Sequence, residues 1–155
     1  MNEKLIITPS EVVLLAFATT DHVRDAQITE AEILAAQQKF MIPVFGELWE
    51  VLCAGEHSDF TQEYIKPALA QFVKARVLPS LGAVTASGVV QRISDTTKRA
   101  ADSDLQRMVR VAYDIARTLR GRAVAQLEAH PELYPEYDKQ KNILHRARID
   151  GGVVL

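Results

Sequence analysis

LQRMVRVAYDIARTLRGRAVAQL, the stretch from Leu105 to Leu127, is the longest unbroken helical pattern in this chain. Apolar side chains recur in it at steps of three and four residues, which places them on one face of an α-helix. They are Leu105, Met108, Val109, Ala112, Ile115, Ala116, Leu119, Ala123 and Leu127. Arginines fall largely on the other side. The stretch therefore predicts a long helix with a buried apolar face and an arginine-rich outer face.

The limits of this helix are marked by capping residues and by a proline. Ser94 or Asp95 begins it, unless the second capping signal at Ser103 separates a short turn from the main helix. Pro131 ends it, because the residue before a proline is pushed out of helical geometry. One continuous helix to Ala129 would be about 50 Å long at ~1.5 Å per residue.

Two earlier helices have clear starts. Thr8, followed by a proline and by Glu11, predicts an N-cap and a capping box. Thr29 and Glu32 predict the same device for the second helix.

Three prolines bear on the helices between residues 30 and 80. Pro43 lies inside the second helical pattern, so we expect a kink near Lys39–Phe45 or two abutting helices. Pro67 marks the point where a first turn ends and the third helix begins, or is internal to that helix, and Pro79 is expected to terminate it.

Two β-branched segments stand apart from the helical patterns. Gly88–Ile93 and Gly151–Leu155 favour short strands, which would pair with each other or add to a neighbouring subunit's sheet. An ordinary loop and a frayed tail explain them equally well. The predicted fold is therefore mainly α, a bundle of four to five helices with a short β element, either a hairpin or a terminal strand.

The chain is expected to be a single helical domain, residues 1–155, with a C-terminal arm over roughly 131–155. A chain of 155 residues can bury roughly 70% of its unfolded surface, enough for a real core. One cysteine, Cys53, excludes an intramolecular disulfide, and no run of about 18 apolar residues predicts a membrane span.

No residue pattern indicates a reaction. None of the four histidines forms a helical metal-binding motif; His22 and Asp25 come closest in spacing and lie in a predicted loop. Phosphate-binding glycine motifs are absent, and paired carboxylates such as Glu30 and Glu32 sit where a helix dipole favours them. We therefore expect no catalytic residues, no metal site and no cofactor, and we do not expect an enzyme.

Charge is divided unevenly along the chain. Residues 1–67 carry eleven acidic and four basic side chains, whereas residues 68–155 carry nine and fourteen. Opposite charges on one small protein suit head-to-tail contact between identical copies, although both parts could simply be solvated.

The arginine face of the long helix is the candidate contact surface. Its members are Arg107, Arg110, Arg117 and Arg120, which could contact another subunit or line a DNA passage. Asp104 and Asp114 interrupt the positive charge, and Tyr113 is the one aromatic residue available for base stacking. Subunit contact or plain solvation therefore explains this face better than direct binding of DNA.

The order of these parts resembles a known family. The strings that carry the likeness are TEAEI at 29–33, IPVFG at 42–46, EYIKPALA at 63–70, GVV at 88–90 and LYPEY at 133–137. Together with the long helix they resemble the small helical head–tail connector (adaptor) proteins of tailed bacteriophages and prophages, the versions from phages of gut Bacteroidales in particular. The likeness covers most of the chain.

This resemblance implies a structural protein of the virion, assembled in the host bacterial cytoplasm. Such proteins form a ring of identical copies between the portal protein and a tail or stopper protein, with possible non-specific DNA in the channel and no membrane. In that arrangement Tyr134, Tyr137, Val153 and Val154 would belong to an arm that contacts a partner. The alternative is a small helical protein-binding or regulatory module that acts as a dimer.

Overall fold

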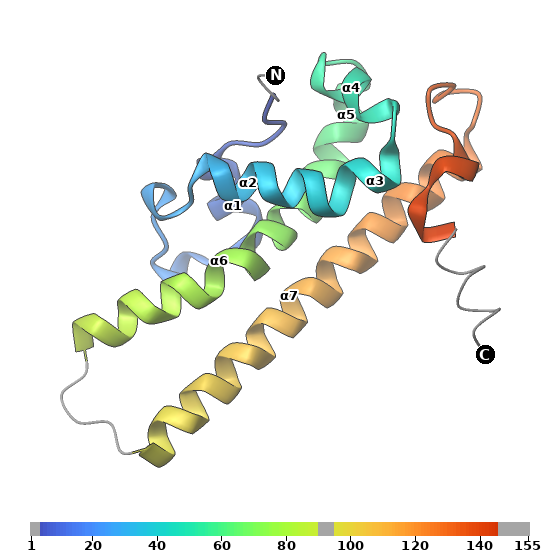
Figure 1. The fold of residues 1–155 in the computed structure, drawn as a ribbon. Helices are drawn as coiled ribbons and strands as arrows, with labels where there is room; N and C mark the ends of the chain where they lie inside the picture. Colours follow the sequence, from blue (N-terminus) through green and yellow to red (C-terminus); the bar gives the residue numbers. More distant parts are fainter. Residues whose placement is uncertain (1–3, 90–94, 146–155) are drawn as a thin grey trace, which may run out of the picture.

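The computed structural model describes residues 4–89 and 95–145, whose regular elements are all helical (Figure 1). The α-helices are α1 (Pro9–Ala16), α2 (Glu30–Ala36), α3 (Ile42–Phe45), α4 (Leu48–Cys53), α5 (Ser58–Phe60), α6 (Lys66–Val89) and α7 (Asp95–Ala129). Short 3-10 turns lie at Thr19–Asp21, Asp25–Gln27 and Lys139–Lys141. The mainly α fold class is thus confirmed. No helix in this part of the chain is both long and apolar enough to cross a membrane.

An antiparallel pair of long helices, α6 and α7, organises the molecule (Figure 1). Helices α1 and α2 pack on α6. Helix α7 packs on α6, with Ala112, Ala116 and Ala123 buried and with Leu105 and Val109 partly buried against Ala75 and Leu78. The long helix predicted from the sequence is confirmed as one element that ends two residues before Pro131.

The centre of the main core is aromatic. Phe72 of α6 is fully buried and its ring stacks on that of Phe40, with centroids 4.4 Å apart and an interplanar angle of 6°. Tyr113 of α7 approaches Phe40 edge-on at 5.6 Å. This group joins three segments that are far apart in sequence, so it fixes where α7 lies on the body.

Helix caps agree with the sequence in most details. The Thr8 hydroxyl accepts a hydrogen bond from the Glu11 backbone N–H, and Glu11 accepts one from the Thr8 N–H, so the capping box is confirmed. Thr29 caps α2 as expected. The expected return contact of Glu32 is wrong, because its carboxylate instead binds Nε of Arg76 at 2.8 Å.

Two of the three prolines follow a π-helical turn. Gln37–Met41 forms one such turn directly before Ile42 and Pro43, and Thr61–Ile65 forms the other directly before Lys66 and Pro67. In a regular α-helix a proline ring clashes with the carbonyl four residues earlier and removes one hydrogen bond. A π-helical turn is wider, because its hydrogen bonds join residues five apart, so it changes the hydrogen bonding at the place where the proline would disrupt it. The expected interruption near Lys39–Phe45 and the expected start at Pro67 are confirmed.

The third proline does not end its helix, which corrects the sequence prediction. Helix α6 continues through Pro79 to Val89. The Pro79 ring lies on the exposed side of the helix, while Val77 and Leu78 before it are buried. Packing of the helix thus outweighs the lost hydrogen bond.

The short β element is not found in the described residues. Gly88 and Val89, where the first strand was expected to begin, are the last residues of α6. β-branched residues lower helix propensity only slightly, so a helix already held by packing can include them. Residues 90–93 and the predicted strand at 151–155 lie outside the described residues.

Acidification should weaken the attachment of α1 to α6 through Glu11. Its carboxylate accepts a hydrogen bond from Nζ of Lys66 at 2.6 Å. Burial alone raises the pKa of Glu11, but the hydrogen bonds from Lys66 and Thr8 outweigh it, so the pKa lies below its usual 4.5. The unfolded chain therefore binds this proton more readily, and the stabilisation present above the usual value is lost as pH falls through the folded pKa.

We expect Glu11→Gln to lower the free energy of unfolding at pH 7 by about 1 kcal/mol, the usual effect of a lost cap contact. The difference between wild type and variant should shrink below pH 4.5. Urea denaturation across pH 2–7 measures the free energy of unfolding of both proteins. In a Lys66→Met background the same substitution should cost less, and an equal cost in both backgrounds would contradict the assignment.

Candidate protein-binding surface on α7

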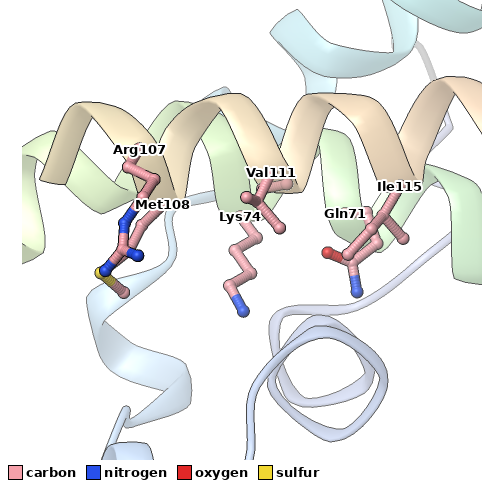
Figure 2. Close-up of a pocket in the computed structure, with 7 residues that line it drawn as sticks. Gln71, Lys74, Arg107, Met108, Val111 and Ile115 are labelled. Carbon is pink, nitrogen blue, oxygen red and sulfur yellow. The ribbon is translucent and has the colours of Figure 1, made fainter. Parts of the chain in front are cut away.

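Three large apolar side chains are exposed along one edge of α7. Met108, Val111 and Ile115 are 47%, 52% and 40% exposed, respectively. They follow one another at steps of three and four residues, so they form one continuous apolar strip, and Figure 2 shows them along the same edge of the helix. A strip of this kind is atypical of a fully solvated helix face.

The strip borders a shallow groove between α6 and α7. Gln71 and Lys74 of α6 line the groove on one side, and Arg107, Ala112 and the strip line it on the other (Figure 2). Its volume is about 200 Å³, below the roughly 300–1,000 Å³ of sites for small molecules. The groove therefore suits the side chains of a partner better than an enclosed ligand.

Lys74 is held in a fixed position at the side of this groove. Its Nζ donates a hydrogen bond to the carbonyl oxygen of Ala16 at 2.9 Å and lies 5.0 Å from the centre of the Phe17 ring. Because Ala16 is the last residue of α1, the bond ties the end of that helix to α6. The ammonium gives this side of the groove a positive charge.

The predicted arginines divide into two groups. Arg107, Arg110 and Arg117 are exposed, next to the strip in sequence. Arg107 makes an ion pair with Asp104 at 3.3 Å within the same exposed helix face, and the Arg117 guanidinium lies 5.6 Å from the centre of the Tyr113 ring. An ion pair this exposed contributes little to stability, so these three charges are available to a partner.

Arg120 instead serves the interior of its own chain. Its Nη1 donates a hydrogen bond to the carbonyl oxygen of Phe40 at 2.7 Å, and its guanidinium lies 5.0 Å from the centre of the Phe72 ring. Burial, and secondarily the charge of Arg117, lowers the pKa of Arg120 below its usual range. The structure thus separates Arg120 from the three exposed arginines with which the sequence grouped it.

The aromatic residues of the C-terminal arm pack onto the body. Tyr134 is buried against Phe60 and His57, with ring centroids 4.9 and 5.0 Å apart. Tyr137 is half-buried, and its hydroxyl accepts a hydrogen bond from Nδ2 of Asn142 at 2.8 Å. Both side chains therefore hold the arm in place. Val153 and Val154, the other predicted arm residues, lie outside the described residues.

The sequence pattern misplaced part of the apolar face of α7. The periodicity predicts that Met108 and Ile115 are buried and does not include Val111, yet the three form the exposed strip. The reason is that other residues of α7, such as Ala112 and Ala116, face the core, and the α6 groups nearest the strip are the polar Gln71 and Lys74. The available signal was an apolar arc on α7 wider than one helix covers.

Comparison with known proteins places most of the chain in a family. A family described as a family of unknown function (DUF6712) matches residues 44–147, a range that includes α6, α7 and the C-terminal arm up to that point. No curated protein matches the chain, and no solved structure matches it.

Proposed function

We propose that this chain, which belongs to the DUF6712 family, is a structural assembly protein whose copies join through the outer edge of α7. The assembly we propose is the ring of a head–tail connector or adaptor between the portal and the tail of a tailed bacteriophage. The resemblance of the sequence to such connectors supports the role, and the α7 surface supplies the contact.

The exposed strip between cations is the observation that carries the proposal. Met108, Val111 and Ile115 leave apolar surface in water, and burying it is favourable by roughly 25 cal/mol per Å². Protein–protein contacts commonly combine such an apolar centre with a charged rim, which Arg107 and Lys74 beside the strip would provide.

The division of charge favours another copy of this chain as the partner. The first 67 residues are strongly acidic and the remainder is basic, so the α7 edge of one copy is complementary to the N-terminal part of the next. A contact between two different faces repeats from copy to copy and closes into a ring when the rotation allows it. Each contact can be weak, because closure makes the set stable.

Charge reversal tests the electrostatic part of this contact. Arg110→Glu with Arg117→Glu should reduce assembly at least tenfold, because two attractive contacts become repulsive at every repeat. Both residues are exposed, so helicity and monomer stability should stay nearly unchanged. The matched control, Lys4→Glu with Arg24→Glu, makes the same change in net charge on the acidic N-terminal part, so it should assemble at least as well as the wild type. Sedimentation velocity gives the comparison, and full assembly of the α7 variant would overturn the proposal.

Removal of exposed apolar side chains tests the apolar part of the proposed contact. Val111→Ser with Ile115→Ser should also abolish assembly while adding no charge. Its control is Leu133→Ser with Ile143→Ser, which removes apolar side chains that are 55% and 48% exposed in the C-terminal arm. An equal loss of assembly in the two double variants would indicate non-specific association.

A second function rests on the same groove. One shallow, positively lined groove also suits a single acidic amphipathic helix, as a small regulatory or binding module would use. Such a module would form a dimer or a defined complex and no ring. A fixed dimer at all concentrations would favour it.

A further inference from the structure

We propose that Glu56, His57 and Glu136 form a binding site for a divalent transition-metal cation, which fastens the C-terminal arm to the turn that precedes α5. The three residues come from two places far apart in sequence. Glu56 and His57 follow α4, and Glu136 lies in the arm that leaves α7. This inference is independent of the proposed assembly.

The three side chains offer a suitable set of ligand atoms. One ligand atom from each, an imidazole nitrogen and two carboxylate oxygens, lies within 4.8 Å of the other two. Nε2 of His57 and Oε2 of Glu136 are 3.5 Å apart. A combination of imidazole with carboxylates is typical of Zn²⁺ and of other first-row divalent metals, with ligand distances of about 2.0–2.2 Å. Small side-chain rotations would bring all three atoms to that distance from one cation.

A second observation points to a missing partner at this place. Nε2 of His57 and Oε2 of Glu136 are almost fully buried, and neither has a hydrogen-bond partner among the described residues. Their mutual distance is that of an ion pair, but the contact lacks hydrogen-bond geometry. A buried polar atom without a partner costs free energy, and a cation between the two would satisfy both.

The other histidine–glutamate pairs of the described chain differ from this group. His130 Nδ1 lies 3.4 Å from Glu132, and His145 Nε2 lies 2.6 Å from Glu128. Neither pair belongs to a cluster of three ligands among the described residues, and Glu128 also binds the ammonium of Lys139 at 3.2 Å. They are plain pairs, and His130 with Glu132 provides a matched control.

The position of the site explains what a bound metal would do. Tyr134, two residues before Glu136, packs against both His57 and Phe60, so the arm already lies on the body here. Coordination bonds from the arm and from the turn before α5 to one cation would fix the arm more firmly to the body. An intramolecular disulfide cannot take this role in a chain with one cysteine. Glu56 is exposed, which leaves the cation accessible to water from that side.

The test uses the full chain, stripped with a chelator and titrated with Zn²⁺ or Mn²⁺ at pH 7.5 by calorimetry and thermal melting. We expect one Zn²⁺ per chain and a rise in Tm of about 5–10 °C at roughly 100 times Kd. His57→Asn and Glu136→Gln should abolish the rise, whereas His130→Asn and Glu132→Gln should keep it. Asparagine is chosen because residue 57 has φ of 51°, a conformation that asparagine tolerates.

A further variant keeps the proposal testable if those changes harm folding. Glu56→Gln leaves the contact between His57 and Glu136 intact, yet it should weaken Zn²⁺ binding at least about tenfold, because even outer groups of metal sites have effects of that size. A simple ion pair between His57 and Glu136 predicts no effect of Glu56→Gln. Absence of Zn²⁺ binding by the wild type, or equal binding by wild type, His57→Asn and Glu56→Gln, would overturn the proposal.

Discussion

Phe72→Ala is expected to lower the free energy of unfolding by about 3–5 kcal/mol, the range for removing a large buried aromatic side chain. Phe72 is fully buried, and its ring contacts Phe40 on one side of the core and Tyr113 of α7 on another. The substitution would thus remove the group through which α6 holds both the α2–α3 segment and α7. Chemical denaturation followed by circular dichroism measures the loss.

The control for this variant lies on the same helix. Ser80→Ala changes an exposed position of α6 and should alter stability by no more than about 0.5 kcal/mol. A loss below about 1 kcal/mol for Phe72→Ala would mean that the aromatic group is not the centre of the core, because even a modest cavity costs more.

Arg120→Ala is expected to destabilise the monomer by about 1.5–3 kcal/mol, the range for a lost hydrogen bond from a charged group. The substitution removes the bond to the Phe40 carbonyl and the packing of the side chain over Phe72. Arg110→Ala, an exposed change on the same helix, should leave monomer stability unchanged within about 0.5 kcal/mol. Denaturation at a concentration where the chain is monomeric gives both values.

This pair of variants decides how the arginines of α7 are used. If Arg120→Ala keeps full monomer stability and reduces assembly, Arg120 belongs with the contact residues after all. The structure predicts the reverse, because its guanidinium is committed to Phe40 and Phe72.

Local rules predicted the starts and interruptions of the helices. Thr8, Thr29 and Pro43 act through hydrogen bonds and steric contacts within a few residues, so their effects can be read from neighbouring positions. Pro79 failed as a terminator because packing of α6 on α7, a contact between distant segments, decides whether the helix continues. Local propensity is a weak guide wherever such packing is extensive.

The sequence predicted which helix carries the candidate surface, but it predicted less well which residues of that helix are exposed. The periodicity of residues 105–127 gave the apolar face and the arginine face, but it could not say how much of the apolar face α6 would cover. Arg120 was grouped with Arg107 and Arg110 because charge alone does not distinguish an internal hydrogen bond from a solvated one. The contact with Phe40 joins residues 80 positions apart.

The proposed metal site could not be found by spacing. His57 and Glu136 approach each other because the arm returns over α5, and a search for ligands three or four residues apart covers only those within one helix. The signals in the sequence were the adjacent Glu56 and His57 and a separate carboxylate in an aromatic segment. Only the fold brings them together.

Native mass spectrometry over a range of protein concentrations, with electron microscopy of the species that form, tests the central claim most directly. The account predicts closed rings of identical copies at high concentration or on addition of a portal protein. It also predicts that Val111→Ser with Ile115→Ser removes the rings and leaves folded monomers. A monomer under all of these conditions, or a ring that survives loss of the α7 strip, would contradict the claim.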